Sequence, residues 1–95
     1  MKYVLVTYQC KKGMRGDFLA AIQAEEIDQK CRAEDGNLKY DYYYPTDGPE
    51  NELFLCEIWR DDDAVKAHGA MPHFKRLGEL KEIYVETTNI TRLEG

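Results

Sequence analysis

Two segments of this 95-residue chain carry apolar side chains in both of the alternating positions of a β-strand. They are KYVLVTYQC at 2–10 and ELFLCEIWR at 52–60, and both are rich in β-branched or aromatic residues. Because successive side chains of a strand point to opposite faces, a strand of this kind needs cover on both sides. We therefore expect a sheet in which both faces of these two strands are buried.

The other segments show helical or extended patterns, with Gly and Pro at their ends. Asp17 and Asp61 are expected to cap helices, and Gly36 ends the first helix at a position that favours the left-handed conformation. Pro72 starts a new helix, because proline is favoured in a first turn. The expected elements are a helix at 18–34, a strand at 37–46, helices at 64–70 and 72–84, and a strand at 85–93.

This order of elements is typical of a ferredoxin-like α+β fold, βαββααβ, with an antiparallel sheet and its helices on one face. The chain length allows one domain, which we place at 1–95. The other face of the sheet then lacks a cover, and a second copy of the same sheet is the simplest one. We therefore expect a homodimer in which two sheets face each other, a dimeric α+β barrel.

Composition narrows the classes of partner. The formal net charge is −5, from 18 acidic and 13 basic residues, and no basic stripe could neutralise a phosphate backbone, so nucleic acid is not expected. No apolar run approaches membrane-spanning length, and no leader pattern opens the chain, so no membrane is expected. Cys10, Cys31 and Cys56 lack a C-x-x-C spacing, which favours a reducing compartment, hence the cytoplasm.

Three residues are candidates for acid-base chemistry. Glu57 is a carboxylate in an apolar strand, on the face we place beneath the helices, so it needs polar partners. His68 lies near a helix C-terminus and His73 at a helix N-terminus, which favours a charged His68 and a neutral His73. The alternatives are a structural Glu57, hydrogen-bonded to an amide or a tyrosine, and histidines that cap or pack a helix joint.

Trp59 and the tyrosines Tyr40, Tyr42 and Tyr44 could line a pocket for a flat aromatic substrate, although packing within the sheet is the simpler explanation for them. No cofactor or metal is expected. His68 and His73 are five residues apart across Pro72, which is not the spacing of the histidines in zinc proteases. No P-loop or dinucleotide-binding fingerprint occurs in the sequence.

Four short motifs carry a resemblance to a known family. They are Glu34-Asp35-Gly36-Asn37-Leu38 with Tyr40, Leu55-x-Glu57-x-Trp59, Ala64 to His68, and Met71-Pro72-His73-Phe74. With these motifs, nearly the whole chain resembles the antibiotic biosynthesis monooxygenase family. That family consists of small dimeric α+β barrel proteins, among them quinol monooxygenases and an isomerase of phosphorylated autoinducer-2.

The resemblance implies oxygenation of a small phenol or hydroquinone by dioxygen, without metal or flavin. The protein then only has to bind and deprotonate the substrate and to exclude water. We expect His73 to take the substrate proton, Glu57 to orient a histidine or the substrate hydroxyl, and His68 to stabilise the anion. Substrate-binding residues would be Trp59, Tyr40, Tyr42 and Phe74.

Two other functions remain open at this point. The same residues would serve an isomerase of a small phosphorylated carbonyl compound, whose phosphate would need cations at the pocket mouth. The candidates for that role are Lys39, Arg60, Lys66, Lys75 and Arg76. The third function is a non-catalytic ligand-binding or stress-related domain, in which tyrosines fill the pocket.

Overall fold

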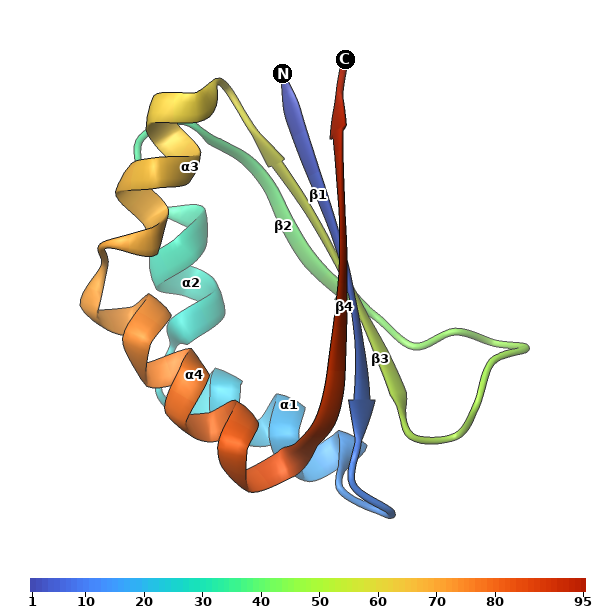
Figure 1. Cartoon of the computed structure of the whole chain (residues 1–95). Helices are drawn as coiled ribbons and strands as arrows, with labels where there is room; N and C mark the ends of the chain where they lie inside the picture. The colour runs from blue at the N-terminus through green and yellow to red at the C-terminus, as the bar shows by residue number, and fades with distance from the viewer.

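A computed structural model describes residues 1–95 as four strands and four helices (Figure 1). No helix combines the length and the apolar composition of a membrane span. The elements in chain order are β1 (Lys2–Cys10), α1 (Arg15–Ala24), α2 (Ile27–Arg32), β2 (Asn37–Tyr43), β3 (Glu52–Trp59), α3 (Asp62–Gly69), α4 (Pro72–Tyr84) and β4 (Val85–Glu94).

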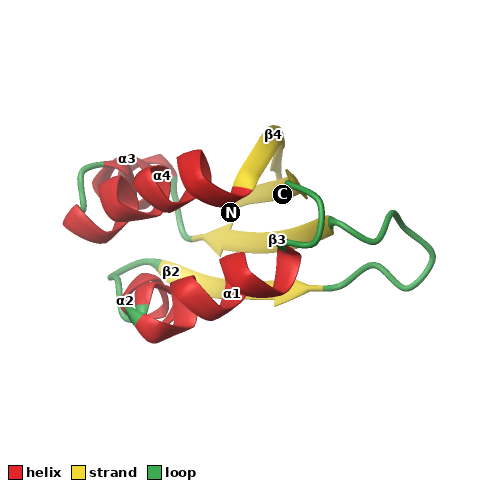
Figure 2. Ribbon diagram, turned by 90° about the horizontal axis from the view of Figure 1, so that it is seen from below, coloured by secondary structure: helices red, strands yellow, loops and turns green.

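The strands form one sheet in the order β2-β3-β1-β4, and all neighbours are antiparallel. All four helices lie on the same face of this sheet, and the two chain ends lie side by side (Figure 1). Seen from below, α1 and α2 form one group and α3 and α4 a second (Figure 2). The expected ferredoxin-like α+β fold is confirmed.

The core lies between the helices and the sheet. The inward side chains of β1 and β3 alternate along each strand and are buried, as the alternation predicts. Phe18 and Ile22 of α1, Cys31 of α2 and Leu77 of α4 meet them from the helix layer. The fully buried side chains of largest volume are Trp59, Tyr40, Phe18, Ile22, Ile27, Leu53, Leu55 and Cys31.

The opposite face of the sheet is half-buried in the single chain, whereas its burial was expected from a second copy. Leu5 of β1 and Phe54, Cys56 and Ile58 of β3 point to this face, and no helix covers it. The apolar character of both faces was predicted correctly from the sequence.

The helix expected at 18–34 is instead two helices, and this expectation was wrong. The first of them begins at Arg15, so Asp17 lies in its first turn and does not cap it as expected. The chain breaks at Glu25 and Glu26, and Glu26 adopts the left-handed conformation with φ 55°. The break changes the direction of the chain, so that α1 packs against α4 and α2 packs against β2. Helical spacing alone does not reveal the break, because Ile22, Ile27 and Cys31 are buried on both sides of it.

The second strand also departs from the expectation. It ends at Tyr43 rather than at residue 46, and its pairing with β3 is irregular between Asn37 and Lys39. Leu38 is therefore 57% exposed although Tyr40, two residues later, is buried. Tyr44 lies outside the strand, where the Arg15 guanidinium packs over its ring.

The left-handed residue between α1 and α2 gives the first prediction. A non-glycine residue in this region is strained, so Glu26→Gly should raise the free energy of unfolding by about 0.5–1 kcal/mol. Gln23→Gly, at an exposed position within α1, should lower it by about 1 kcal/mol. Urea denaturation measures both, and destabilisation by both variants would contradict the assignment of strain to Glu26.

Candidate functional site

A cavity of about 260 Å³ lies between the helix-covered face of the sheet and α3 and α4. Its walls are mostly apolar, formed by Val4 and Val6 of β1, Leu77 of α4 and Ile90 of β4 among others. Glu57 of β3 and His68 of α3 are among the ionisable groups that line it. A small apolar cavity with few polar groups is typical of a small-molecule site.

Glu57 lies at the centre of the sheet, opposite Val4 of β1 and Tyr40 of β2 in the strand pairing. It is 6% exposed, and its Oε1 accepts a hydrogen bond of 2.9 Å from the Trp59 indole nitrogen. Burial raises the pKa of Glu57 to about 7, against the lowering effect of the Trp59 hydrogen bond and with a smaller rise from the charge of Glu34. The carboxyl group can therefore exchange a proton near neutral pH.

His68 is enclosed by aromatic rings near the C-terminal end of α3. Its ring centroid lies 4.5 Å from that of Trp59, and 5.1 Å from that of Phe74 in an edge-to-face arrangement. Its Nε2 lies 3.9 Å from Glu57 Oε1. The Asp61 side chain fixes the start of α3 by accepting a hydrogen bond from the Ala64 amide, which confirms the expected cap.

The other ring nitrogen of His68 binds a residue that the site prediction missed. Nδ1 lies 2.6 Å from Glu34 Oε2, and His73 Nε2 lies 2.8 Å from the same oxygen. Glu34 is 5% exposed at its side chain, although it follows the C-terminus of α2. Helical spacing carried a usable signal, because Glu34 comes three residues after the inward-facing Cys31.

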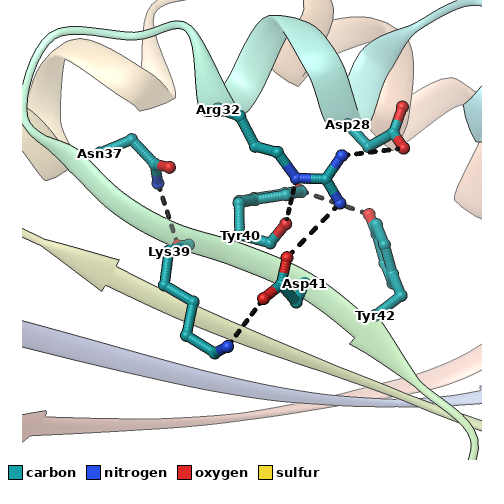
Figure 3. Close-up of polar contacts among 7 residues, drawn as sticks. All are labelled: Asp28, Arg32, Asn37, Lys39, Tyr40, Asp41 and Tyr42. Carbon is teal, nitrogen blue, oxygen red and sulfur yellow. Dashed lines mark hydrogen bonds and ion pairs between the residues drawn. The ribbon is translucent and has the colours of Figure 1, made fainter.

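Arg32 holds the end of α2 against the sheet and so positions Glu34. Its Nε donates a hydrogen bond of 2.8 Å to the Tyr40 carbonyl oxygen on the outer edge of β2, and its guanidinium contacts Asp28 and Asp41 (Figure 3). The chain then turns at Gly36, whose φ is 86°, but α2 already ends at Arg32 with Ala33 as its C-cap, so Gly36 does not cap the helix as expected. A Cβ atom at this glycine would lie 2.6 Å from the Ala64 Cβ, so the turn passes directly against α3.

The structure brings some of the predicted site residues together and separates others. Glu57, His68, Tyr40 and Phe74 line the cavity. Trp59 lies behind the cavity wall, in contact with the first two of these groups. Tyr42 and His73 do not line it: the Tyr42 hydroxyl lies 3.3 Å from the Tyr40 hydroxyl, and His73 faces a separate surface depression beside α1 and α2. The roles assigned to these residues stay predictions.

The cations near the cavity differ from those proposed for a phosphorylated substrate. None of Lys39, Arg60, Lys66, Lys75 and Arg76 lines the cavity. Lys81 of α4 and Arg92 of β4 do, and burial lowers the pKa of Lys81. Sequence reasoning missed both, because it considered no cation from the last turn of α4 or from the edge strand.

One group of side chains could hold a metal ion. Cys31, Glu34, His68 and His73 each place a donor atom within 4.8 Å of the others. Thiolate sulfur, imidazole nitrogen and carboxylate oxygen are the ligands that zinc takes in proteins. The short hydrogen bonds between Glu34 Oε2 and the two imidazoles join three of these four side chains.

The raised pKa of Glu57 predicts how stability changes with pH. The folded chain binds the Glu57 proton more tightly than the unfolded chain, so stability is lost as the pH rises from 4.5, the ordinary value, to about 7. Glu57→Gln keeps an oxygen for the Trp59 hydrogen bond and removes the ionisation. Between about pH 5 and about pH 8, the wild type should lose about 2–3 kcal/mol of unfolding free energy relative to this variant.

Urea denaturation at the two pH values measures this difference, in buffer with a chelator so that bound metal does not contribute. All other titrating groups are shared by the two proteins, so the comparison isolates Glu57. Parallel pH profiles for the wild type and the variant would show that Glu57 is not held in a desolvated environment.

Comparisons with known proteins agree with this architecture. Residues 1–80 match the family model described as antibiotic biosynthesis monooxygenase. The protein named "Putative monooxygenase YcnE" of Bacillus subtilis (strain 168) is 33% identical over 93 residues, which cover 96% of this chain and 95% of the relative.

Solved structures give the same result for the fold. PA3566 from Pseudomonas aeruginosa superposes with a TM-score of 0.86 at 24% identity, over 99% of this chain and 92% of that one. Rv0793 from Mycobacterium tuberculosis superposes with a TM-score of 0.79 at 26% identity, over 99% of this chain and 93% of that one. The chain thus belongs to the antibiotic biosynthesis monooxygenase family, and a monooxygenase activity is the one that this family and the curated relative support.

Proposed function

We propose that the chain oxygenates a small phenol or hydroquinone with dioxygen, and that neither flavin nor metal takes part in the oxygen chemistry. The observation that carries this proposal is the pair of polar atoms at the cavity, Glu57 Oε1 and His68 Nε2, 3.9 Å apart. They do not hydrogen-bond to each other. A single substrate hydroxyl can therefore bridge them, with its ring against the apolar walls.

In this arrangement Glu57 accepts the hydroxyl proton and His68 donates a hydrogen bond to the phenolate. The phenolate is electron-rich and lies against mostly apolar walls, which favours electron transfer to dioxygen. A hydroquinone gains one oxygen atom and leaves as a hydroxyquinone, and the second oxygen atom is released as water. This reaction balances atoms and electrons without an external reductant. The substrate supplies all four electrons.

The proposal changes one role expected from the sequence. His73 was expected to take the substrate proton directly, but it does not line the cavity. We assign that contact to Glu57 instead, because Glu57 both faces the cavity and has His68 beside it. Trp59 holds the Glu57 carboxylate through its indole hydrogen bond, and Phe74 and Tyr40 form part of the cavity wall that contacts the ring.

A second function is favoured by one specific observation. Lys81 and Arg92 at the cavity would bind a phosphate or another anionic group, which an isomerase of a small phosphorylated carbonyl compound requires. Oxygen uptake with hydroquinones separates this function from the first, since an isomerase instead exchanges substrate protons with solvent. Binding without either reaction would favour a non-catalytic ligand-binding domain.

The oxygenation proposal predicts the effect of removing either polar group. Glu57→Gln and His68→Ala should each lower kcat for oxygen uptake by roughly 100-fold or more, because each removes one partner of the substrate hydroxyl. Glu52→Gln, in the same strand but outside the cavity, is the matched control and should leave kcat unchanged. An oxygen electrode with a series of hydroquinones provides the measurement. Wild-type uptake no faster than autoxidation in buffer would refute the proposal.

We also propose that two chains pair through the helix-free face of the sheet, as the half-buried Leu5, Phe54 and Ile58 require a cover. Multi-angle light scattering should give twice the chain mass of 11.1 kDa. Ile58→Lys should shift the mass toward that of one chain, whereas Ile83→Lys, at an exposed position of α4 on the helix side, should not. A wild-type monomer at micromolar concentration would contradict the pairing.

A further inference from the structure

The cluster of Cys31, Glu34, His68 and His73 joins three helical segments behind the cavity. Cys31 lies in the last turn of α2, and Glu34 follows three residues later. His68 comes from the last turns of α3 and His73 from the first turn of α4, on the two sides of the α3–α4 joint. Their donor atoms all lie within 4.8 Å of one another.

The charge of this cluster is not balanced by any cationic side chain of fixed charge. Glu34 has only imidazole partners, at 2.6 and 2.8 Å, and no Lys or Arg forms an ion pair with it or with Glu57. With neutral imidazoles, the nearly buried Glu34 carboxylate would have no counter-charge beside it. A buried carboxylate of this kind needs a positive charge beside it.

The donor set selects the class of ion. One thiolate, two imidazoles and one carboxylate suit zinc and other divalent d-block ions, whereas calcium and magnesium prefer oxygen ligands alone. Four protein ligands also fill a tetrahedral shell and leave no open position, which is typical of a structural site. A bound ion would take the place of the protons that Glu34 now shares with the two imidazoles, with small movements of these side chains.

We propose that Cys31, Glu34, His68 and His73 bind one zinc-like divalent ion, which ties α2 to the α3–α4 joint. The His68 ligand is Nδ1, so Nε2 carries its proton toward Glu57 and the cavity, as carboxylates behind the ligands orient zinc-bound histidines in other proteins. The site is closed, so the ion takes no part in the proposed oxygenation. The ion-binding proposal is independent of that activity.

Titration of the chelator-treated protein with Co²⁺ tests the site, because a thiolate ligand gives a near-ultraviolet charge-transfer band and tetrahedral ligands give intense visible bands. We expect both at one equivalent, with zinc displacing the cobalt. Zinc should also raise the Tm, since an ion that binds only the folded chain stabilises it. Cys31→Ser should lose the thiolate band, and His73→Ala should weaken zinc binding by at least roughly 10-fold.

Cys56→Ser is the matched control, because this free cysteine lies on the other face of the sheet and outside the cluster. Cys56→Ser should keep the cobalt thiolate band and the zinc affinity of the wild type. The His73 side chain is 12% exposed, so circular dichroism has to show that His73→Ala keeps its fold before the affinities are compared. A cobalt spectrum without the thiolate band, or equal zinc affinity in the wild type and His73→Ala, would overturn the proposal.

Discussion

The structure depends on the burial of one carboxyl group, that of Glu57, in the middle of a sheet. An acid at this position is unfavourable unless polar groups reach it, and the partner within its own strand is the Trp59 indole. The approach of His68 then requires α3 to cross the sheet at this point, with its start fixed by Asp61. The cavity lies between this polar pair and the apolar walls, so the candidate site is built directly on the core of the sheet.

The two faces of the sheet are used differently, although both are apolar. The helix-covered face holds the core, the cavity and every polar group of the site, whereas the other face has only half-buried side chains in the single chain. This division follows from the connections: each crossover between β1 and β2 or between β3 and β4 runs through helices on the same side (Figures 1 and 2). The free face is thus available for pairing without disturbing the site.

Much of the fold and part of the site could be predicted from the sequence, and the failures have physical reasons. Alternation along β3 placed Glu57 and Trp59 on the same inward face, and helix-end chemistry located the joint near His68. Glu34 was missed as a site residue because its role comes from two imidazoles far away in the chain. The break at Glu26 was missed because no glycine or proline marks it, and buried residues continue on both sides. Lys81 was missed because its place at the cavity depends on how α4 packs against the sheet.

Glu57 and His68 together are proposed to bind the hydroxyl group of a small aromatic substrate, and the function depends on this contact. The most direct measurement is a crystal structure of the protein with a redox-inert phenol bound. We expect the phenol oxygen to lie within hydrogen-bond distance of both Glu57 Oε1 and His68 Nε2, with the ring against Phe74. A phenol bound elsewhere, or bound in the cavity with its oxygen directed away from both groups, would contradict the proposed function.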